Sequence, residues 1–508
     1  MKQRLPKFIC LLLLPVLLLT GCWSEELPEE EDFLPSGDLI SETPSSNVIL
    51  PEHLSLPYAP ELTLDPLFCP DGMQQVVSSL ICEGLFRVGP DLEPTPWLCE
   101  SYTYAPDTFT YVFTLRNGVR FSDGSALTGN DVKSALNRAK SSERYGSRLT
   151  QVASISADDR TVTVTLSSAN SGFPALLDVP ISKAGPEGTP VGTGPYLFTV
   201  ENSAAWLIAN QTWWCGIKQP VSRIALVEAS DQDTMLYRFT SHDVQLVTAD
   251  LAGTDPISAT GSIVYRDVNT TILQYIGCNT TREPLNDPIF RRLLSQGIDR
   301  TNLVSAFLSG HGLAAQFPVS PAAALYPQDL EIPYSHSDFA TALASGEYAL
   351  DRTLTLLVNQ ENTFKLSAAQ EIAKNLTSAG VPVTVRSLPW AEYTAALSAG
   401  NFDLYYGEVK LTADWDLSPL LGTGGSLNYG GWTDPVTDQL LDTYASSADR
   451  SAAMKRLCIH LQNQAPILPL CFKSTSVLLQ SDVFENLTST MSDPFYNLTE
   501  CVVHLKHP

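Results

Sequence analysis

Two aspartates close together offer the simplest route to catalysis in this sequence of 508 residues. Asp414 and Asp416 are two apart, so on a strand they would face one side and could mimic the paired carboxylates of a glycosidase. That spacing is common by chance. The chain contains no G-x-S-x-G, H-E-x-x-H or Walker A pattern and no S-x-x-K followed by K-T-G. We therefore predict that the protein is not an enzyme.

Histidine and cysteine spacing does not predict a metal centre. The closest histidines are His504 and His507, near the chain end, where a mobile polar tail is the simpler interpretation. Nickel favours imidazole ligands, so this pattern gives little support for a nickel site. The eight cysteines after Cys22 contain no C-x-x-C pair, which argues against a zinc knuckle. Their pairing into disulfides stays open, and we expect no metal and no cofactor.

Charge and one glycine-rich turn argue against two further kinds of site. The net charge of −24 disfavours nucleic-acid binding, because phosphate recognition needs clustered Lys and Arg. Gly192-Thr193-Gly194 lacks the lysine and hydroxyl of a P-loop. We interpret it as a tight crossing between chain segments rather than a nucleotide site.

The N-terminus has the zones of an export signal. Three cations precede an apolar run from Phe8 to Leu19, which is shorter than the about 20 residues of a membrane-spanning helix. Leu19-Thr20-Gly21-Cys22 resembles a bacterial lipobox, in which the cysteine is acylated and becomes the new N-terminus. We predict a lipoprotein signal peptide over residues 1–21 and a lipid anchor at Cys22. Residues 22–47, rich in Glu, Pro and Ser, are predicted as a flexible tether.

Residue patterns after the tether indicate strands at several places. Thr110 to Phe121 alternates aromatic and β-branched residues around Asn117-Gly118, which predicts a β-hairpin that turns at this dipeptide. Asp158 to Leu166 and Asp351 to Val358 are predicted as two further strands.

Helix starts and stops are equally clear. Thr128 is placed as an N-cap, with Asp131 three residues on to complete a capping box. Asp287-Pro288 marks a second start, with aspartate at N-cap and proline at N1. Leu366 to Leu388 is predicted as a helix ended by Gly380 and followed by a strand. The class is mixed α/β, and the chain length predicts at least two lobes.

Seven segments, taken in order, resemble the family 5 extracellular solute-binding proteins, the receptors of peptide and nickel ABC importers. The most diagnostic is PDTFTYVFTLRNGVRFSDGSALTGNDVKSAL (Pro106 to Leu136), similar to the family's extended strands, Phe-x-Asp-Gly turn and helix start. Their order and their spread over nearly the whole mature chain carry the resemblance. The other six are SLICEGLFRVGPDLEPTPWLCESY (Ser79 to Tyr102), PVGTGPY (Pro190 to Tyr196), NQTWW (Asn210 to Trp214), YIGCNTTREPLNDPIFRRLLSQGIDRTNLV (Tyr275 to Val304), NYGGWTDPVTDQLL (Asn428 to Leu441) and APILPLCF (Ala465 to Phe472).

The resemblance implies a two-lobed α/β fold of the periplasmic-binding-protein type (type II, large peptide-binding class). A ligand would be enclosed in a cleft between the lobes as they close by hinge motion. We expect the first lobe to comprise residues 48–265 and 473–508, including an extra subdomain at about 85–188. The second lobe is expected over residues 266–472.

The resemblance also suggests ligand contacts. Ala413-Asp414-Trp415 matches a motif whose aspartate pairs with the α-ammonium of a peptide in the peptide-binding members, and Trp415 would add a flat apolar wall. The alternative is that Asp414 caps a helix or faces solvent. The family's Gly-Trp ahead of the aspartate is replaced by Glu408, Val409 and Lys410.

Two further residues near this motif have more than one interpretation. Lys410 could receive a ligand carboxylate, or it could pair with Glu408 or Asp414. Trp432, which follows Gly430-Gly431, is another candidate wall, although an aromatic residue there is more often part of the core.

These observations together predict a lipid-anchored substrate-binding subunit of an ABC importer, most simply one that captures short peptides. Its partners would be a permease and an ATPase, and we expect a monomer without nucleic acid. The predicted location is the outer face of the cytoplasmic membrane or the periplasm. A peptide or pheromone sensor, or a receptor for another solute such as a nickel chelate or a sugar, remains as the alternative.

Overall fold

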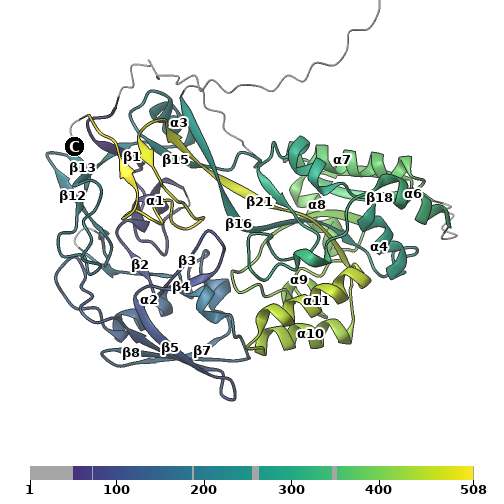
Figure 1. Ribbon diagram of the computed structural model, residues 1–508, viewed down its shortest axis with the longest axis horizontal. Coiled ribbons are helices and arrows are strands. Elements are labelled where there is room, and N and C mark those ends of the chain that lie inside the picture. Colours follow the sequence, from purple (N-terminus) through teal and green to yellow (C-terminus); the bar gives the residue numbers. More distant parts are fainter. Residues whose placement is uncertain are drawn as a thin grey trace, which may run out of the picture. The chain divides into compact units, whose positions relative to one another are not determined.

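The computed structural model describes residues 50–70, 72–185, 188–254, 262–345, 350 and 352–506. By contacts the chain divides into two compact units, Met1–Val48 and Ile49–Pro508, and all described residues belong to the second. Figure 1 shows its helices and strands. The predicted signal peptide, the tether and the anchor at Cys22 lie outside the described residues.

The first lobe is built on a four-stranded sheet in the order β1-β14-β13-β12. β1 pairs with β14 in parallel, and the other pairs are antiparallel. Helix α1 packs against β1, and the two share a buried apolar cluster with β14 and β21. The bounds are β1 (Leu54–Tyr58), α1 (Met73–Ser79), β12 (Tyr196–Glu201), β13 (Ala204–Ala209), β14 (Arg223–Glu228) and α3 (Gln232–Thr240).

A second four-stranded sheet, in the order β5-β6-β8-β7, lies within the range of about 85–188 where the extra subdomain is expected. The two central strands, β6 and β8, alternate buried and half-buried residues, and the buried ones pack against helix α2. The bounds are β5 (Cys99–Ala105), β6 (Thr110–Leu115), α2 (Gly129–Ala139), β7 (Val152–Ala157) and β8 (Thr161–Leu166). Short strands around it are β2 (Glu83–Gly84), β3 (Phe86–Val88), β4 (Pro94–Pro96), β9 (Pro180–Ile181), β10 (Lys183–Ala184) and β11 (Pro190–Val191).

The predicted hairpin at Asn117-Gly118 is wrong. Strand β6 pairs with β5 on one side and with β8 on the other, so both of its edges are already occupied. Gly118 does adopt a positive φ of 77°, which redirects the chain. The residues beyond it form a single bridge between Arg120 and Ala126 instead of a strand against β6.

The predicted helix starts are confirmed. Thr128 accepts from the backbone N–H of Asp131, and the Asp131 carboxylate accepts from the N–H of Thr128, which completes the capping box of α2. Asp287 caps α4 (Pro288–Gln296). Helix α7 (Thr363–Ser378) begins earlier than predicted, at the N-cap Asn362, and Gly380 follows its end with a φ of 110°.

The predicted strands have shorter bounds than the sequence pattern suggested. β8 starts at Thr161 because the Asp158 carboxylate first accepts from the N–H groups of Arg160 and Thr161, at 2.8 and 2.7 Å. β18 spans Leu354–Asn359, and β19, the strand predicted after Gly380, spans Val383–Leu388.

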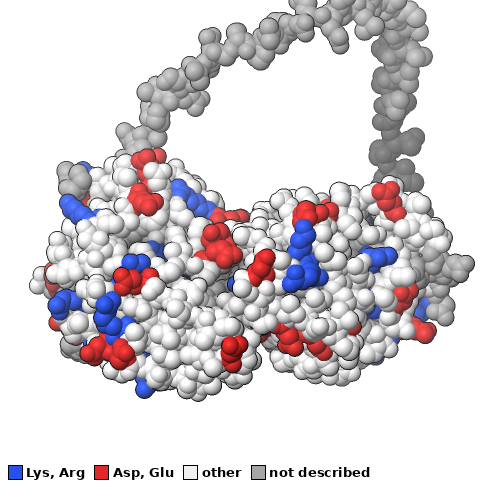
Figure 2. All heavy atoms as spheres, turned by 60° about the horizontal axis from the view of Figure 1, so that its bottom comes forward, with Lys and Arg blue, Asp and Glu red and all other residues white. Residues whose placement is uncertain are grey.

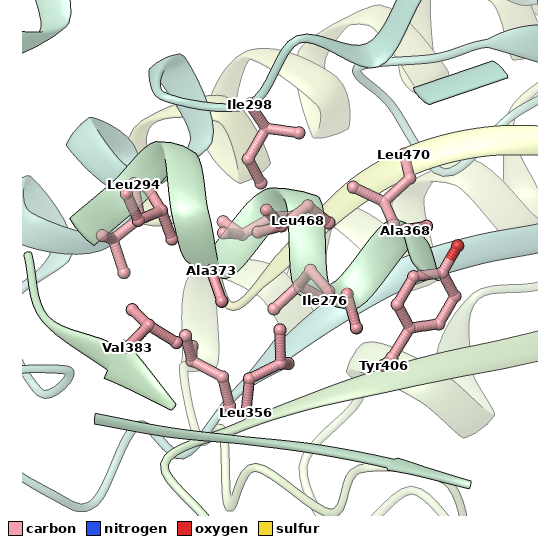
Figure 3. Packing of buried hydrophobic residues seen from close by; sticks show 14 of the residues in the cluster. Ile276, Leu294, Ile298, Leu356, Ala368, Ala373, Val383, Tyr406, Leu468 and Leu470 are labelled. Atoms are coloured by element: carbon pink, nitrogen blue, oxygen red, sulfur yellow. The ribbon is translucent and has the colours of Figure 1, made fainter. Parts of the chain in front are cut away.

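A larger sheet has the order β15-β21-β16-β20-β18-β19, with β17 paired to β21. Its edge strand β15 packs with α3 of the first lobe, whereas β20, β18 and β19 belong to the second lobe. Helices α4 and α7 pack on one face of this sheet, and α8, α10 and α11 on the other. Figure 3 shows the first of these cores, in which Ile276, Leu356 and Leu468 meet α7. The bounds are β15 (Leu246–Ala249), β16 (Ile263–Cys278), β17 (Gly312–Ala314), α8 (Trp390–Ser398), β20 (Leu404–Lys410), α10 (Pro435–Ser446), α11 (Arg450–Gln464) and β21 (Ile467–Gln480). Shorter elements of the second lobe are α5 (Arg300–Asn302), α6 (His336–Ser345) and α9 (Ser418–Leu421). The paired strands β22 (Phe484–Glu485) and β23 (Val502–Val503) pack against the apolar cluster of the first lobe.

Two long strands, β16 and β21, connect the lobes. They run side by side in Figure 1 and pair antiparallel over most of their length. Val268 and Val477 belong to the apolar cluster of the first lobe, whereas Leu273 and Phe472 belong to that of the second. The expected lobe boundaries at 265/266 and 472/473 therefore fall inside continuous strands.

Among the described residues, the eight cysteines after Cys22 are all free thiols, seven of them buried and Cys215 partly exposed. Each therefore contributes to packing rather than to a covalent link. Within the same residues, no helix combines the length and the apolar character that crossing a membrane requires.

Candidate ligand-binding site

A cavity of about 980 Å³ lies between segments of the two lobes. The first lobe lines it with parts of residues 62–70, 141–148 and 490–492. The second lobe lines it with Thr271 and with Lys410–Ala413, the end of β20 and the turn that follows. The volume falls in the range of about 300–1,000 Å³ that small-molecule sites occupy.

The cavity wall carries more cations than acids. Three cations line it, Arg144, Arg148 and Lys410, against two acids, Glu143 and Asp178. Arg148 and Asp178 form an ion pair at 2.7 Å with little exposed side chain on either residue. This balance contrasts with the net charge of −24 of the chain. It favours a ligand that brings a carboxylate or another anionic group.

Figure 2 shows one face of the molecule, on which acidic and basic side chains are scattered among uncharged ones. No continuous basic patch appears on that face of the described part.

Arg144 is positioned by backbone carbonyls. Its guanidinium donates to the carbonyl oxygens of Cys69 at 2.7 Å and of Pro66 at 3.3 Å. These contacts hold the cation at the wall formed by residues 62–70. The sequence offered no motif for this arginine, because its partners lie 75 and 78 residues away.

Lys410 ends β20 and lines the cavity. Its possible partner Glu408 accepts hydrogen bonds or ion pairs from Lys365 at 3.2 Å, Gln274 at 2.8 Å and Lys473 at 3.8 Å. Burial alone would raise the pKa of Glu408, but the two lysines and Gln274 hold it below its ordinary value. Glu408 is thus strongly engaged by groups on the α7 side of the sheet.

Asp414 is buried beside the cavity rather than in its wall. Asp414 is only 4% exposed. Its Oδ2 accepts a hydrogen bond from Nδ2 of Asn170, a first-lobe residue, at 2.7 Å. Burial raises the pKa of Asp414, and hydrogen bonds from Thr412 and Asn170 offset part of that effect. Both alternatives from the sequence, a helix cap and a solvent-facing carboxylate, are wrong. The nearest helix, α9, has Leu417 at its N-cap and no side-chain cap.

The two candidate tryptophans lie away from the cavity wall. Trp415 is 1% exposed and packs edge-on against Phe472 in the second-lobe core, with ring centroids 5.7 Å apart. Trp432 packs under the guanidinium of Arg291 and donates from Nε1 to Thr437 at 3.3 Å. Of the four ligand contacts suggested by the sequence, Lys410 is the one that the structure places among the lining residues.

A buried carboxylate in the first lobe was missed by the sequence reasoning. Glu83 is 8% exposed and accepts from the indole N–H of Trp97 at 2.8 Å, Trp213 at 3.2 Å and Trp214 at 2.8 Å. The hydroxyl of Thr193 donates to it at 2.7 Å. Burial raises the pKa of Glu83, and these four neutral donors offset part of the rise.

The signal for this arrangement was present in the sequence. Glu83, Trp97, Thr193 and the Trp213-Trp214 pair all lie in the segments that carried the family resemblance. The tight crossing predicted at Gly192-Thr193-Gly194 is confirmed, because an added Cβ on either glycine would collide with the backbone of Ile81. The resemblance therefore marked a structural core more than a ligand site.

Asp414 and Asp416 do not form the paired carboxylates that their spacing in the sequence raised as a catalytic possibility. Asp416 accepts from the backbone N–H of Ser418 at 2.9 Å and lines a separate surface hollow, so it does not face Asp414 across a cleft. Within the described ranges, no group of three His, Cys, Asp or Glu residues is arranged to hold a metal ion.

Comparison with known proteins identifies the family. Residues 93–428 match the family described as bacterial extracellular solute-binding proteins, family 5, middle region. The chain belongs to this family. Its members are described as extracellular solute-binding proteins of bacteria.

Individual relatives share only about a fifth to a quarter of their aligned residues with this chain. The glutathione-binding protein GsiB of Salmonella typhimurium is 26% identical over 388 residues, which cover 71% of this chain and 76% of GsiB. A nickel ABC transporter structure from Bacillus halodurans superposes with a TM-score of 0.76 at 20% identity, covering 89% of this family 5 chain and 100% of the other. The oligopeptide-binding protein AppA of Bacillus subtilis, in complex with a nonapeptide, gives a TM-score of 0.59 at 20% identity, with coverages of 89% and 100%. These structural matches establish the two-lobed fold.

Proposed function

We propose that this family 5 protein is a lipid-anchored receptor that captures a short peptide between its lobes and delivers it to an ABC permease. The observation that carries the proposal is the cavity of about 980 Å³ with walls from both lobes. A ligand that contacts both walls stabilises the closed arrangement over an open one, and closure is the signal a permease can read.

The charge of the cavity supports a ligand with a free carboxylate. Lys410 stands at the second-lobe wall and Arg144 at the first-lobe wall. A terminal carboxylate placed near either cation gains a charge-assisted hydrogen bond. GsiB, the relative described above, is named for a tripeptide that carries two carboxylates, which is consistent with this choice.

The lipid anchor at Cys22 is the second part of the proposal. An acylated cysteine followed by a tether would keep the receptor close to its transporter. If only one acyl chain were attached to the cysteine, stable anchoring would need a second contact with the membrane. Mass spectrometry of the exported chain checks this directly. The expected mass shows loss of residues 1–21 and gain of acyl groups, and a Cys22→Ser variant shows neither.

The cargo is tested by calorimetry on the full-length Cys22→Ser chain with trialanine, reduced glutathione and a nickel–histidine complex. Binding of one of the two peptides is expected. Lys410→Ala should weaken the affinity for a peptide with a free carboxylate by about tenfold, and have less effect on its C-terminal amide. The control is Lys374→Ala, whose side chain is 73% exposed on α7. Binding of the nickel complex without either peptide would overturn the peptide assignment.

A further inference from the structure

The lobes also touch beside the cavity, at a contact that we call the seam. It consists of residues 170–172 of the first lobe and of Asp414, Tyr444, Ala445 and Arg450 of the second. Asn170 Nδ2 donates to Asp414 Oδ2 at 2.7 Å, and the backbone N–H of Ser171 donates to the carbonyl of Ala445 at 2.7 Å. The preceding residue, Ala413, lines the cavity, so opening the seam also opens that side of the cavity.

The first lobe holds the amide of Asn170 ready for this contact. Tyr111 donates its hydroxyl to the Asn170 carbonyl at 2.8 Å, and Asn170 Oδ1 accepts from the N–H of Gly172 at 3.0 Å. A second donation from Nδ2 reaches Gln151 at 3.2 Å. Asn170 is 6% exposed. Its amide is therefore oriented by its own lobe and not by Asp414 alone.

The second lobe holds Asp414 in the same way. Tyr444 donates to the backbone carbonyl of Asp414 at 2.8 Å, and the guanidinium of Arg450 donates to that carbonyl and to the Tyr444 hydroxyl. Gly172 leaves room for this guanidinium, because a Cβ there would lie 2.6 Å from Arg450 Nη2. The cation thus donates to the main chain rather than to the carboxylate. The Asp414 carboxylate accepts from Asn170 across the seam, and from Thr412 and the N–H of Asp416 within its own lobe.

We propose that Asn170 and Asp414 form a latch between the lobes, so that Asp414 is not the receptor for a ligand ammonium and the site accepts peptides with a blocked amino terminus. The statement about which peptides the site accepts rests on the proposed peptide function, whereas the latch does not. An ammonium could reach the Asp414 carboxylate only by displacing the Asn170 amide. It would also have to enter a seam that the hydrogen bond from the Ser171 N–H to the Ala445 carbonyl keeps closed.

The latch is tested by hydrogen exchange on the full-length Cys22→Ser chain without added ligand. The amide of Ser171 is expected to be protected, because its partner Ala445 lies across the seam. Asn170→Ala should lower this protection by about tenfold or more, since it removes a hydrogen bond to a charged group. Asn137→Ala is the control: it is the same substitution at an exposed site of α2, in the same subdomain.

Two results would overturn the latch. One is an unprotected Ser171 amide in the unsubstituted chain, and the other is equal protection in the Asn170→Ala and control proteins. Gly172→Ala provides a second variant that leaves Asn170 intact. It should lower the protection as well, because the added methyl pushes the Arg450 guanidinium away from Asp414 and Tyr444.

The specificity is tested by calorimetry with trialanine and N-acetyl-trialanine. We expect affinities within about threefold of each other, because an exposed ammonium that makes no buried ion pair contributes little. A loss of about a hundredfold on acetylation would assign the ammonium to Asp414 and overturn the specificity. If trialanine, N-acetyl-trialanine and reduced glutathione all fail to bind while Ser171 behaves as expected, the peptide function and the specificity fail and the latch stands.

Discussion

Two buried carboxylates, Glu83 and Asp414, are satisfied by neutral donors, yet they serve different regions of the molecule. Glu83 collects four donors from one lobe, three indoles and a hydroxyl, on segments between residues 97 and 214. Asp414 receives one side-chain amide from the opposite lobe, 244 residues away in sequence. Both carboxyl groups have pKa values raised by burial.

The difference lies in what must move for each contact to break. The Glu83 contacts are internal to the first lobe, so they are lost only when that lobe unfolds. The Asp414 contact spans the lobes, so a hinge motion breaks it while both cores stay intact. The same chemistry can thus stabilise a fold in one place and a conformational state in another.

The largest effect is expected from Glu83→Ala. The substitution leaves three indole N–H groups and the Thr193 hydroxyl without their acceptor, and it should lower the free energy of unfolding of the first lobe by about 3 kcal/mol. Denaturant titration followed by tryptophan fluorescence measures this. Glu100→Ala, at an exposed ion pair with Arg160, should cost less than about 0.5 kcal/mol. Equal effects of the two substitutions would show that the indole contacts do not stabilise the lobe.

A smaller effect on unfolding is expected from Asp414→Ala. Its partner Asn170 can turn to water once the seam opens, so the free energy of unfolding should fall by about 1 kcal/mol or less. The Ser171 amide should nevertheless lose its protection from hydrogen exchange. Asp442→Ala, exposed on α10, is the control. A cost as large as that of Glu83→Ala would mean that the two carboxylates do not differ in role.

The smallest effect is a dependence of the seam on pH. The pKa of Asp414 is raised above its ordinary value of 3.8, so closing the seam favours the protonated carboxyl group. The stabilisation of the seam that comes from this protonation is therefore fully present below pH 3.8. It is lost as the pH rises through the folded pKa. Protection of the Ser171 amide, corrected for intrinsic exchange, should therefore fall modestly between about pH 4 and pH 7.

Other charges surround this carboxyl group, and the control removes their contribution. Arg450 and Asp416 act on Asp414 directly, and Glu93 acts on the nearby Tyr444. Burial raises the pKa values of Tyr111 and Tyr444 well beyond this range, so neither titrates there. Asp414→Asn does not titrate at this position, so its protection should change less with pH. The same slope in both proteins would assign the effect to Glu93 or another group.

Local rules of the sequence predicted the parts of the fold that depend on near neighbours. The capping box of Thr128 and Asp131 and the start at Asp287-Pro288 involve contacts of two or three residues along the chain. The hairpin prediction at Asn117-Gly118 failed because it used the same local logic for β6. The partners of that strand were decided by β5 and β8, whose edges complete a sheet under α2.

The candidate site shows the same limit. Lys410 was identified from a departure in the sequence and does line the cavity. Asp414 was identified from a resemblance, but its burial and its partner Asn170 depend on how the surfaces of two lobes meet. No pattern near residue 414 contains that information, because the amide comes from a loop that follows β8.

The sequence by itself determined the α/β class, the family, the helix caps and the tight crossing at Gly192-Thr193-Gly194, because each depends on residue type at short spacing or on an ordered set of motifs. The tertiary structure alone decided where the charges act. It gathered donors from three segments around Glu83, assigned Glu408 to Lys365 and Lys473, and closed Asp414 against Asn170. Those outcomes follow from burial, because a buried polar group is costly without a partner and most therefore pair with groups that the fold brings near.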